Sequence, residues 1–151
     1  MDIFLEKVVA TSEQVKQLYS QLKRRIHNIS HNKLPSFDEH AKFVEDNPYR
    51  EWFIIKREEI DIGSLYVQFD NSIGLYCIED ISPSQLQELL KLLIDNIKPL
   101  DPIPSVRSGD LFLNIASSDV EMQRKLTSIG YVEIQRSYAL PMLHNKLNSE
   151  N

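Results

Sequence analysis

The chain has 151 residues, 42% hydrophobic and 26% charged, a balance typical of one globular domain rather than of a disordered chain. Twenty-two acidic against seventeen basic residues give a formal net charge of −5, which disfavours sequence-unspecific nucleic-acid binding. The single cysteine, Cys77, excludes an intrachain disulfide and a cysteine-rich zinc site. Because no apolar run approaches the ~18 residues of a membrane span and the start does not resemble a signal peptide, we expect a cytoplasmic protein.

The first part of the chain predicts one strand and two helices. Residues 3–9 are rich in β-branched and aromatic side chains, which favours a strand. Two capping-box pairs follow, in which a Ser or Thr is followed three residues later by Gln or Glu and begins a helix: Thr11 with Gln14, and Ser36 with Glu39. After the first box, apolar residues recur at helical spacing at Val15, Leu18, Tyr19, Leu22 and Ile26. The second helix must end before Pro48.

The middle of the chain predicts three strands, at residues 51–56, 60–69 and 72–78. Asp70 and Asn71, which tolerate left-handed backbone angles, stand between the last two and predict a tight hairpin. Strands joined by such short connections must be antiparallel.

The last third predicts two helices and further strands. Ser82 with Gln85 and Ser118 with Glu121 are capping boxes, and the second of these helices ends at Gly130. Residues 98–110, with three prolines, form the longest connector between them, followed by a strand at residues 111–115. Residues 131–140 predict one bent strand or two short ones.

This order of elements predicts a mixed sheet with helices on both faces, because the strand, helix, strand sequence late in the chain implies a parallel crossover. The expected buried residues are Val67, Leu75, Leu89, Leu90, Leu93, Leu113, Ile115 and Val132.

The order of elements and several short motifs resemble the GNAT superfamily of N-acetyltransferases over nearly the whole chain. The most specific stretch is Leu113-Asn114-Ile115, then a helix, then Leu126-Thr127-Ser128-Ile129-Gly130-Tyr131. Residues 135–140 resemble the closing strand of that family, and residues 28–52 its substrate-side helices.

The resemblance implies one α/β (α+β) domain over residues 1–151, with residues 141–151 as a flexible tail. Its mostly antiparallel central sheet would have six to seven strands and about four flanking helices. It also implies acetyl transfer from acetyl-CoA, or transfer from another acyl-CoA, to a small amine such as an amino sugar, amino acid or polyamine. A homodimer through the closing strands is an arrangement that this fold allows.

Site residues follow from the same resemblance. Glu79 and Asp80 stand where the fold places a catalytic base, and the backbone N–H near Ile78 where it polarises the thioester carbonyl. The pyrophosphate loop aligns with residues 82–87, so the implied cofactor-binding residues are Ile78, Ser82, Ser84, Gln85, Leu86, Gln87 and Asn114. The alternative for Glu79 and Asp80 is a structural role, as solvated acidic residues that stabilise the positive end of the following helix.

The sequence departs from the family pattern in its pyrophosphate loop and its general acid. Residues 82–87 contain neither the glycines nor the arginine of the family loop, and Leu126 stands where many members carry a tyrosine thought to protonate the leaving thiolate. These departures keep an alternative open, in which the protein is a catalytically inactive binding module of the same fold.

Other side chains are candidates for the acceptor pocket. His31, Trp52, Tyr66 and Tyr138 could line it, although aromatic residues in strands more often belong to a core and a lone histidine more often lies on the surface. No metal site is expected, because His27, His31 and His40 lack a further well-spaced ligand. Lys23-Arg24-Arg25 complements a helix dipole, with phosphate anchoring as its alternative.

Overall fold

The computed structural model describes residues 3–25 and 33–141, which contain five strands and four helices. In chain order they are β1 (Ile3–Lys7), α1 (Ser12–Arg24), α2 (Phe37–Asp46), β2 (Glu51–Arg57), β3 (Ile60–Val67), β4 (Ser72–Cys77), α3 (Pro83–Asn96), β5 (Phe112–Asn114) and α4 (Val120–Ser128). No helix in the described part of the chain is long and apolar enough to cross a membrane.

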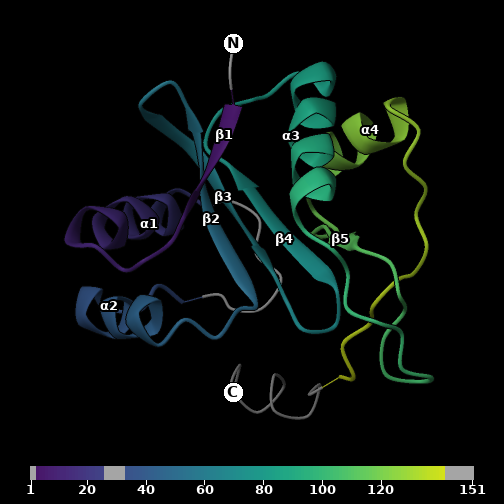
Figure 1. The fold of residues 1–151 in the computed structure, drawn as a ribbon, viewed down its shortest axis with the longest axis horizontal. Coiled ribbons are helices and arrows are strands. Elements are labelled where there is room, and N and C mark those ends of the chain that lie inside the picture. Colours follow the sequence, from purple (N-terminus) through teal and green to yellow (C-terminus); the bar gives the residue numbers. More distant parts are fainter. Residues whose placement is uncertain (1–2, 26–32, 142–151) are drawn as a thin grey trace, which may run out of the picture.

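The strands form one sheet in the order β1-β2-β3-β4-β5 (Figure 1). The first four are antiparallel neighbours, with a register shift between Ile55 and Lys56, whereas β4 and β5 are parallel. The mixed, mostly antiparallel sheet is confirmed. The expected six or seven strands are not, because the described residues supply five.

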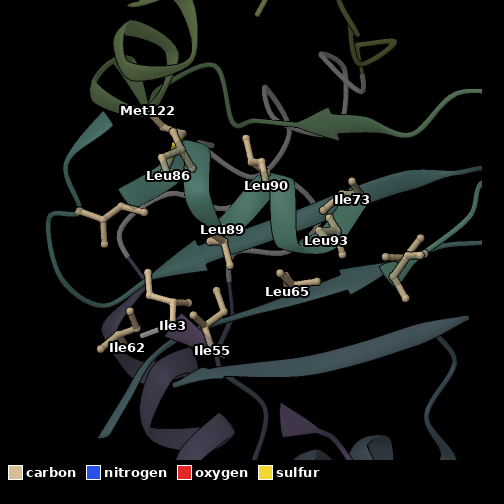
Figure 2. Close-up of a cluster of buried hydrophobic side chains, with 13 residues drawn as sticks. Ile3, Ile55, Ile62, Leu65, Ile73, Leu86, Leu89, Leu90, Leu93 and Met122 are labelled. Atoms are coloured by element: carbon tan, nitrogen blue, oxygen red, sulfur yellow. The ribbon is translucent and has the colours of Figure 1, made fainter. Parts of the chain in front are cut away.

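Helices cover both faces of the sheet, as predicted. Figure 1 shows α1 and α2 on one side, and α3 and α4 on the other. Side chains alternate between the two faces along a strand, so Ile54 packs in the core under α1 and α2 while its neighbour Ile55 packs under α3. Figure 2 shows the larger core, in which the apolar stripe of α3 lies over the sheet at Leu86, Leu89, Leu90 and Leu93.

Three of the four predicted helix starts are confirmed in atomic detail. The side chains of Thr11, Ser36 and Ser82 each accept a hydrogen bond from the backbone N–H three residues later. The fourth prediction is wrong by one residue. Asp119 rather than Ser118 is the N-cap of α4, because its carboxylate accepts from the N–H of Met122. An acidic side chain also suits the positive end of the helix dipole.

The turn between β3 and β4 is confirmed, and its residue Asn71 also holds the long connector. Asn71 has a φ of 73°, in the left-handed region. Its buried amide donates to the carbonyls of Leu100 and Ser108 and accepts from the N–H of Leu100, at 2.7–3.0 Å. The connector 98–110 therefore lies against the sheet end without regular secondary structure.

The predicted strand at residues 131–140 is wrong, since this segment has no regular structure and is exposed throughout. Val132, expected in the core, is 80% exposed. The physical reason is that a strand pattern sets only the local backbone, whereas a strand needs hydrogen-bonding partners. Of the other expected core residues, Leu75, Leu113 and Ile115 are half-buried against the core, and the rest are buried. Apart from Pro141, the expected tail lies outside the described residues.

Candidate functional site

The candidate site is a cleft where the parallel strands β4 and β5 separate. Their pairing ends at Gly74 and Asn114, although β4 continues to Cys77. The gap opens into a cavity of about 440 Å³. Its walls come from the ends of α1, β4 and β5, from β3, from the loop before α3, and from α4. The lining residues are Arg24, Arg25, Tyr66, residues 74–81, residues 114–116, Asp119, Glu121, Met122 and Lys125.

The backbone of β4 presents an unpaired donor to this cleft. The N–H of Ile78 donates to the carbonyl of Ile62 at 2.8 Å, so it faces β3. Backbone groups alternate in direction along a strand, and the N–H of Cys77 therefore points toward the β5 side, beyond the last paired residue. Of the donors near Ile78, the one available to a group in the cleft is that of Cys77.

The two acidic candidates line the cleft mouth, and each is held by a cation. The carboxylate of Glu79 accepts from the guanidinium of Arg57 at the end of β2. Asp80 accepts from the ammonium of Lys125 on α4, so this ion pair joins the loop before α3 to α4. Glu79 is half exposed and Asp80 is 88% exposed, so both carboxylates are in contact with water.

The N-terminus of α3 uses most of its own donors. Pro83 has no N–H, the N–H of Gln85 donates to the Ser82 hydroxyl, and the N–H of Ser82 donates to the Gln85 side chain. The N–H of Ser84 is the remaining donor of this first turn with no such local partner. A phosphate at this position would therefore meet the Ser84 N–H and two hydroxyls rather than a cradle of free N–H groups.

The other residues predicted in this loop are placed differently. The Leu86 side chain is fully buried in the core, and Gln87 is exposed on α3. Neither residue lines the cleft, and neither do Ser82, Ser84 or Gln85. Of the implied cofactor-binding set, Ile78 and Asn114 are the two residues that line it.

Basic and aromatic side chains form the part of the cleft nearest α1. The guanidinium of Arg25 lies over the ring of Tyr76, 5.3 Å from its centroid, a cation–π distance. Burial raises the pKa of Tyr76, and the nearby positive charge of Arg25 opposes that shift. Among the described residues, no carboxylate forms an ion pair with Arg24 or Arg25.

Tyr66 connects this wall to the core beneath it. Its ring stacks on that of Tyr49 at 3.9 Å and lies against Gly74, where a Cβ atom would be 2.1 Å from the ring. Burial, and then the neighbouring Tyr66, raise the pKa of Tyr49 to about 12. The phenol of Tyr49 is therefore protonated at physiological pH, and its stacking on Tyr66 fixes both rings.

The remaining predicted substrate residues do not come together here. Trp52 is buried in the core under α1 and α2, which is the usual place of an aromatic residue in a strand. Tyr138 is 82% exposed in the segment after α4, and His31 and His27 lie outside the described residues. His40 is buried against the ring of Tyr19, and burial lowers its pKa. No cluster of metal-ligating side chains occurs in the described ranges.

Cys77 lies in the cleft wall, but its thiol is unreactive. Burial raises the pKa of its thiol to about 12, despite the opposing charge of Lys125. A thiol with that pKa is protonated at neutral pH and is a poor nucleophile. The prediction of a buried small hydrophobe fits this environment.

Sequence reasoning missed Lys125 and underestimated Arg25. A lysine in the last turn of a helix is too common to signal a site, and only the approach of α4 to the loop before α3 gives Lys125 its partner. Arg24 and Arg25 carried a weak signal, a basic patch at a helix end. Their position in the cleft depends on the angle at which α1 crosses the sheet.

No protein-family model matches the sequence, and a search of curated proteins finds no match. Solved structures do match. The N-acetyltransferase PseH from Campylobacter jejuni has a TM-score of 0.58 at 14% identity, over 89% of this chain and 91% of that one. Spermidine N-acetyltransferase from Vibrio cholerae has a TM-score of 0.53 at 15% identity, over 88% and 81%. The aminoglycoside N-acetyltransferase AAC(6')-Iy has 0.58 at 10%, over 94% and 95%.

Identities this low establish the fold alone. The chain has the fold of the GNAT N-acetyltransferases, with the separated parallel pair β4 and β5 at one edge of its sheet. The resemblance drawn from the sequence motifs is confirmed at this level.

Proposed function

We propose that the protein is an acyl-CoA dependent N-acyltransferase that transfers an acetyl group directly to a small amine. The observation that carries this proposal is the cleft between β4 and β5, with the unpaired N–H of Cys77 on its wall. PseH has been solved with acetyl coenzyme A, and AAC(6')-Iy with CoA, on the same fold.

The residues of the cleft fit the arm of the cosubstrate better than its phosphates. A cavity of about 440 Å³ beside an unpaired strand edge suits a narrow amide-bearing chain, which can hydrogen bond to that edge. At the start of α3, the Ser84 N–H remains for a phosphate. The Ser82 and Ser84 hydroxyls share a hydrogen bond of 3.1 Å, so one O–H of that pair remains beside it. Acetyl-CoA would supply an activated thioester, and amine attack would form the C–N bond as the C–S bond breaks.

Within this proposal, the chain's own groups position the thioester and remove the proton from the attacking amine. The N–H of Cys77 would donate to the thioester oxygen, where negative charge develops. Glu79 would take the ammonium proton, directly or through water, because it lies at the cleft mouth and contacts solvent. Asp80 would fix the entrance through Lys125. Leu126 cannot protonate the leaving thiolate. Tyr76, a neutral phenol in the cleft wall, would donate that proton instead.

The charge of the cleft wall near α1 limits which amines the cleft would accept. Arg24 and Arg25 bring two positive charges into the wall near α1 without a carboxylate partner in the described part of the chain. The carboxylates of the lining lie instead on the side of α4 and the loop before α3, at Glu79, Asp80, Asp119 and Glu121. A polyamine would meet repulsion at the arginines, whereas an amine that also carries a carboxylate or phosphate would be attracted. Among the acceptors under consideration, we therefore favour amino acids and acidic amino sugars over polyamines.

The test is an acyl-transfer assay that follows thiol release from acetyl-CoA, with an amino acid panel, an amino sugar phosphate and spermidine as acceptors. We expect Glu79→Gln to lower kcat by about 100-fold, the magnitude of one general base. Arg25→Gln should raise KM for acidic acceptors about tenfold, the equivalent of one charged hydrogen bond. Spermidine as the best substrate would overturn the acceptor assignment.

Absence of transfer with every acceptor, together with no acetyl-CoA binding, would overturn the proposal itself. The alternative reading, an inactive binding module, would then account for the occupied donors at the start of α3.

A further inference from the structure

Two buried glutamines fasten α1 to the sheet. Gln14 and Gln21 are seven residues apart, so they lie on the same face of the helix, two turns from each other. Both side chains are buried. The amide of Gln14, at the start of α1, donates to the carboxylate of Glu6 at 3.1 Å and to the carbonyl of Lys7 at 2.9 Å. This first contact fastens the helix to β1.

The second contact, at Gln21, fastens the last turn of α1 to β3. The Gln21 amide donates to the carboxylate of Asp61 at 2.9 Å and to the carbonyl of Gly63 at 3.1 Å. Ile62, which lies between these two acceptors, has no counterpart in β2, because the register of the two strands shifts there. Such a bulge disrupts the regular ladder of hydrogen bonds. The side chain of Gln21 therefore supplies a donor at a point where β3 is irregular.

This anchoring point on β3 is directly beside the cleft. Gly63 lies opposite Cys77 of β4, and the next pair is Ser64 with Tyr76. A Cβ atom on Gly63 would collide with the carbonyl of Tyr76, so the two strands approach closely here. Tyr76 and Cys77 both line the cleft. Gln21 thus fixes the end of α1 one strand away from the cleft wall.

Arg25 takes its position from the same turn of the helix. It follows Gln21 by four residues, and its N–H donates to the carbonyl of Leu22 at 3.3 Å, as the C-cap of α1. Its guanidinium lies 5.3 Å from the centroid of the Tyr76 ring. Among the described residues, no carboxylate holds Arg25 in place. Its position over Tyr76 therefore depends on where α1 ends above the sheet.

We propose that Gln21 is a positioning residue, which holds the end of α1 on β3 so that Arg25 stays over Tyr76 in the cleft wall. Through Arg25 it sets the affinity for the acidic group of the acceptor. This second role rests on the proposed function, whereas the placement of Arg25 does not. A loss of the Gln21 hydrogen bonds lets the helix end move, and the guanidinium moves with it.

The first experiment needs no activity and compares Gln21→Met with the natural chain. Methionine has nearly the volume of glutamine but no donor. In protein labelled with ¹³C-tyrosine, the ring signal of Tyr76 should move toward its position in Arg25→Gln. Gln14→Met is the matched control, because it removes an amide with the same kinds of acceptor about 10 Å further along the helix. The Tyr76 signal should stay in place in that variant.

The second experiment measures acetyl transfer to an amino sugar phosphate. Gln21→Met should raise KM for this acceptor about fivefold, less than the effect of Arg25→Gln because the guanidinium is displaced rather than removed. The kcat and the KM for acetyl-CoA should not change. In the Arg25→Gln background, Gln21→Met should cause no further rise, because the two residues act through one group.

Asp61→Ala is a milder variant that removes one of the two Gln21 hydrogen bonds, and it should move the Tyr76 signal in the same direction. An unchanged signal in both Gln21→Met and Asp61→Ala would overturn the proposal, as would an equal change in Gln14→Met. A further fivefold rise in KM in the double variant would also contradict it. If the natural chain transfers no acetyl group while the Tyr76 signal moves as expected, the proposed function fails and the placement of Arg25 by Gln21 stands.

Discussion

Asn71 is the residue whose side chain organises the longest stretch of irregular chain. Its amide makes three hydrogen bonds to the connector, and its backbone is left-handed. We predict that Asn71→Ala lowers the free energy of unfolding by about 3 to 4 kcal/mol, from about 1 kcal/mol per hydrogen bond and about 1 kcal/mol of backbone strain. Urea denaturation at neutral pH measures this loss.

The control for this prediction is Asn96→Ala. The Asn96 side chain donates a single, exposed hydrogen bond to Leu92, so its loss should cost less than about 0.5 kcal/mol. Equal losses for the two variants would show that Asn71 does not hold the connector.

The buried thiol of Cys77 makes the free energy of unfolding decrease at alkaline pH. The pKa of its thiol is about 12 in the folded protein, against 9.0 for the free side chain. Between these values the unfolded chain loses the proton and the folded chain keeps it, so stability present below pH 9 is lost as the pH rises. From about pH 8 to about pH 10 the unfolding free energy should fall by about 1.4 kcal/mol on account of Cys77.

The matched variant is Cys77→Ala, which removes the titrating group and keeps the contribution of Tyr49, also shifted to about 12. Urea titrations of both proteins across this range should therefore converge as the pH rises. Parallel stability curves would mean that the thiol is not buried as described.

The end of α4 shows how a single position terminates an element. Gly130 lies at a φ of 96°, and a Cβ atom there would have open space around it, so backbone strain is the main penalty for a side chain. We predict that Gly130→Ala costs about 1 to 2 kcal/mol, and that Gly130→Asn costs less because asparagine tolerates this region better. Thermal or urea unfolding of the pair measures the order, and an alanine variant as stable as the natural protein would contradict it.

Elements with their own local signals were predictable from the sequence. Thr11, Ser36 and Ser82 mark helix starts because the capping hydrogen bond closes within three residues. Residues 131–140 carry an equally clear strand pattern, but whether they pair depends on an edge elsewhere. The same distinction applies to the site. Glu79 and Asn114 follow from their places at strand ends, whereas the contacts of Arg25 and Lys125 depend on how helices cross the sheet.

In the molecule as a whole, the two helical layers meet the cleft from opposite faces of the sheet. Arg25 at the end of α1 reaches it from one face, and Lys125 on α4 from the other, because the separation of β4 and β5 opens the sheet between them. Under the proposed function, a cleft lined by residues from both layers would hold the acyl donor and the amine side by side, as direct transfer between two bound molecules requires.

The measurement that tests this arrangement most directly is a calorimetric titration of the full chain with acetyl-CoA. The proposal predicts one site per chain with micromolar affinity. Ala116→Phe, which fills part of the cleft, should weaken this affinity at least tenfold, whereas Ala41→Ser on α2 should leave it unchanged. Absence of binding at millimolar acetyl-CoA would contradict it, because the donors left at the start of α3 and along β4 would then be insufficient to hold the cosubstrate.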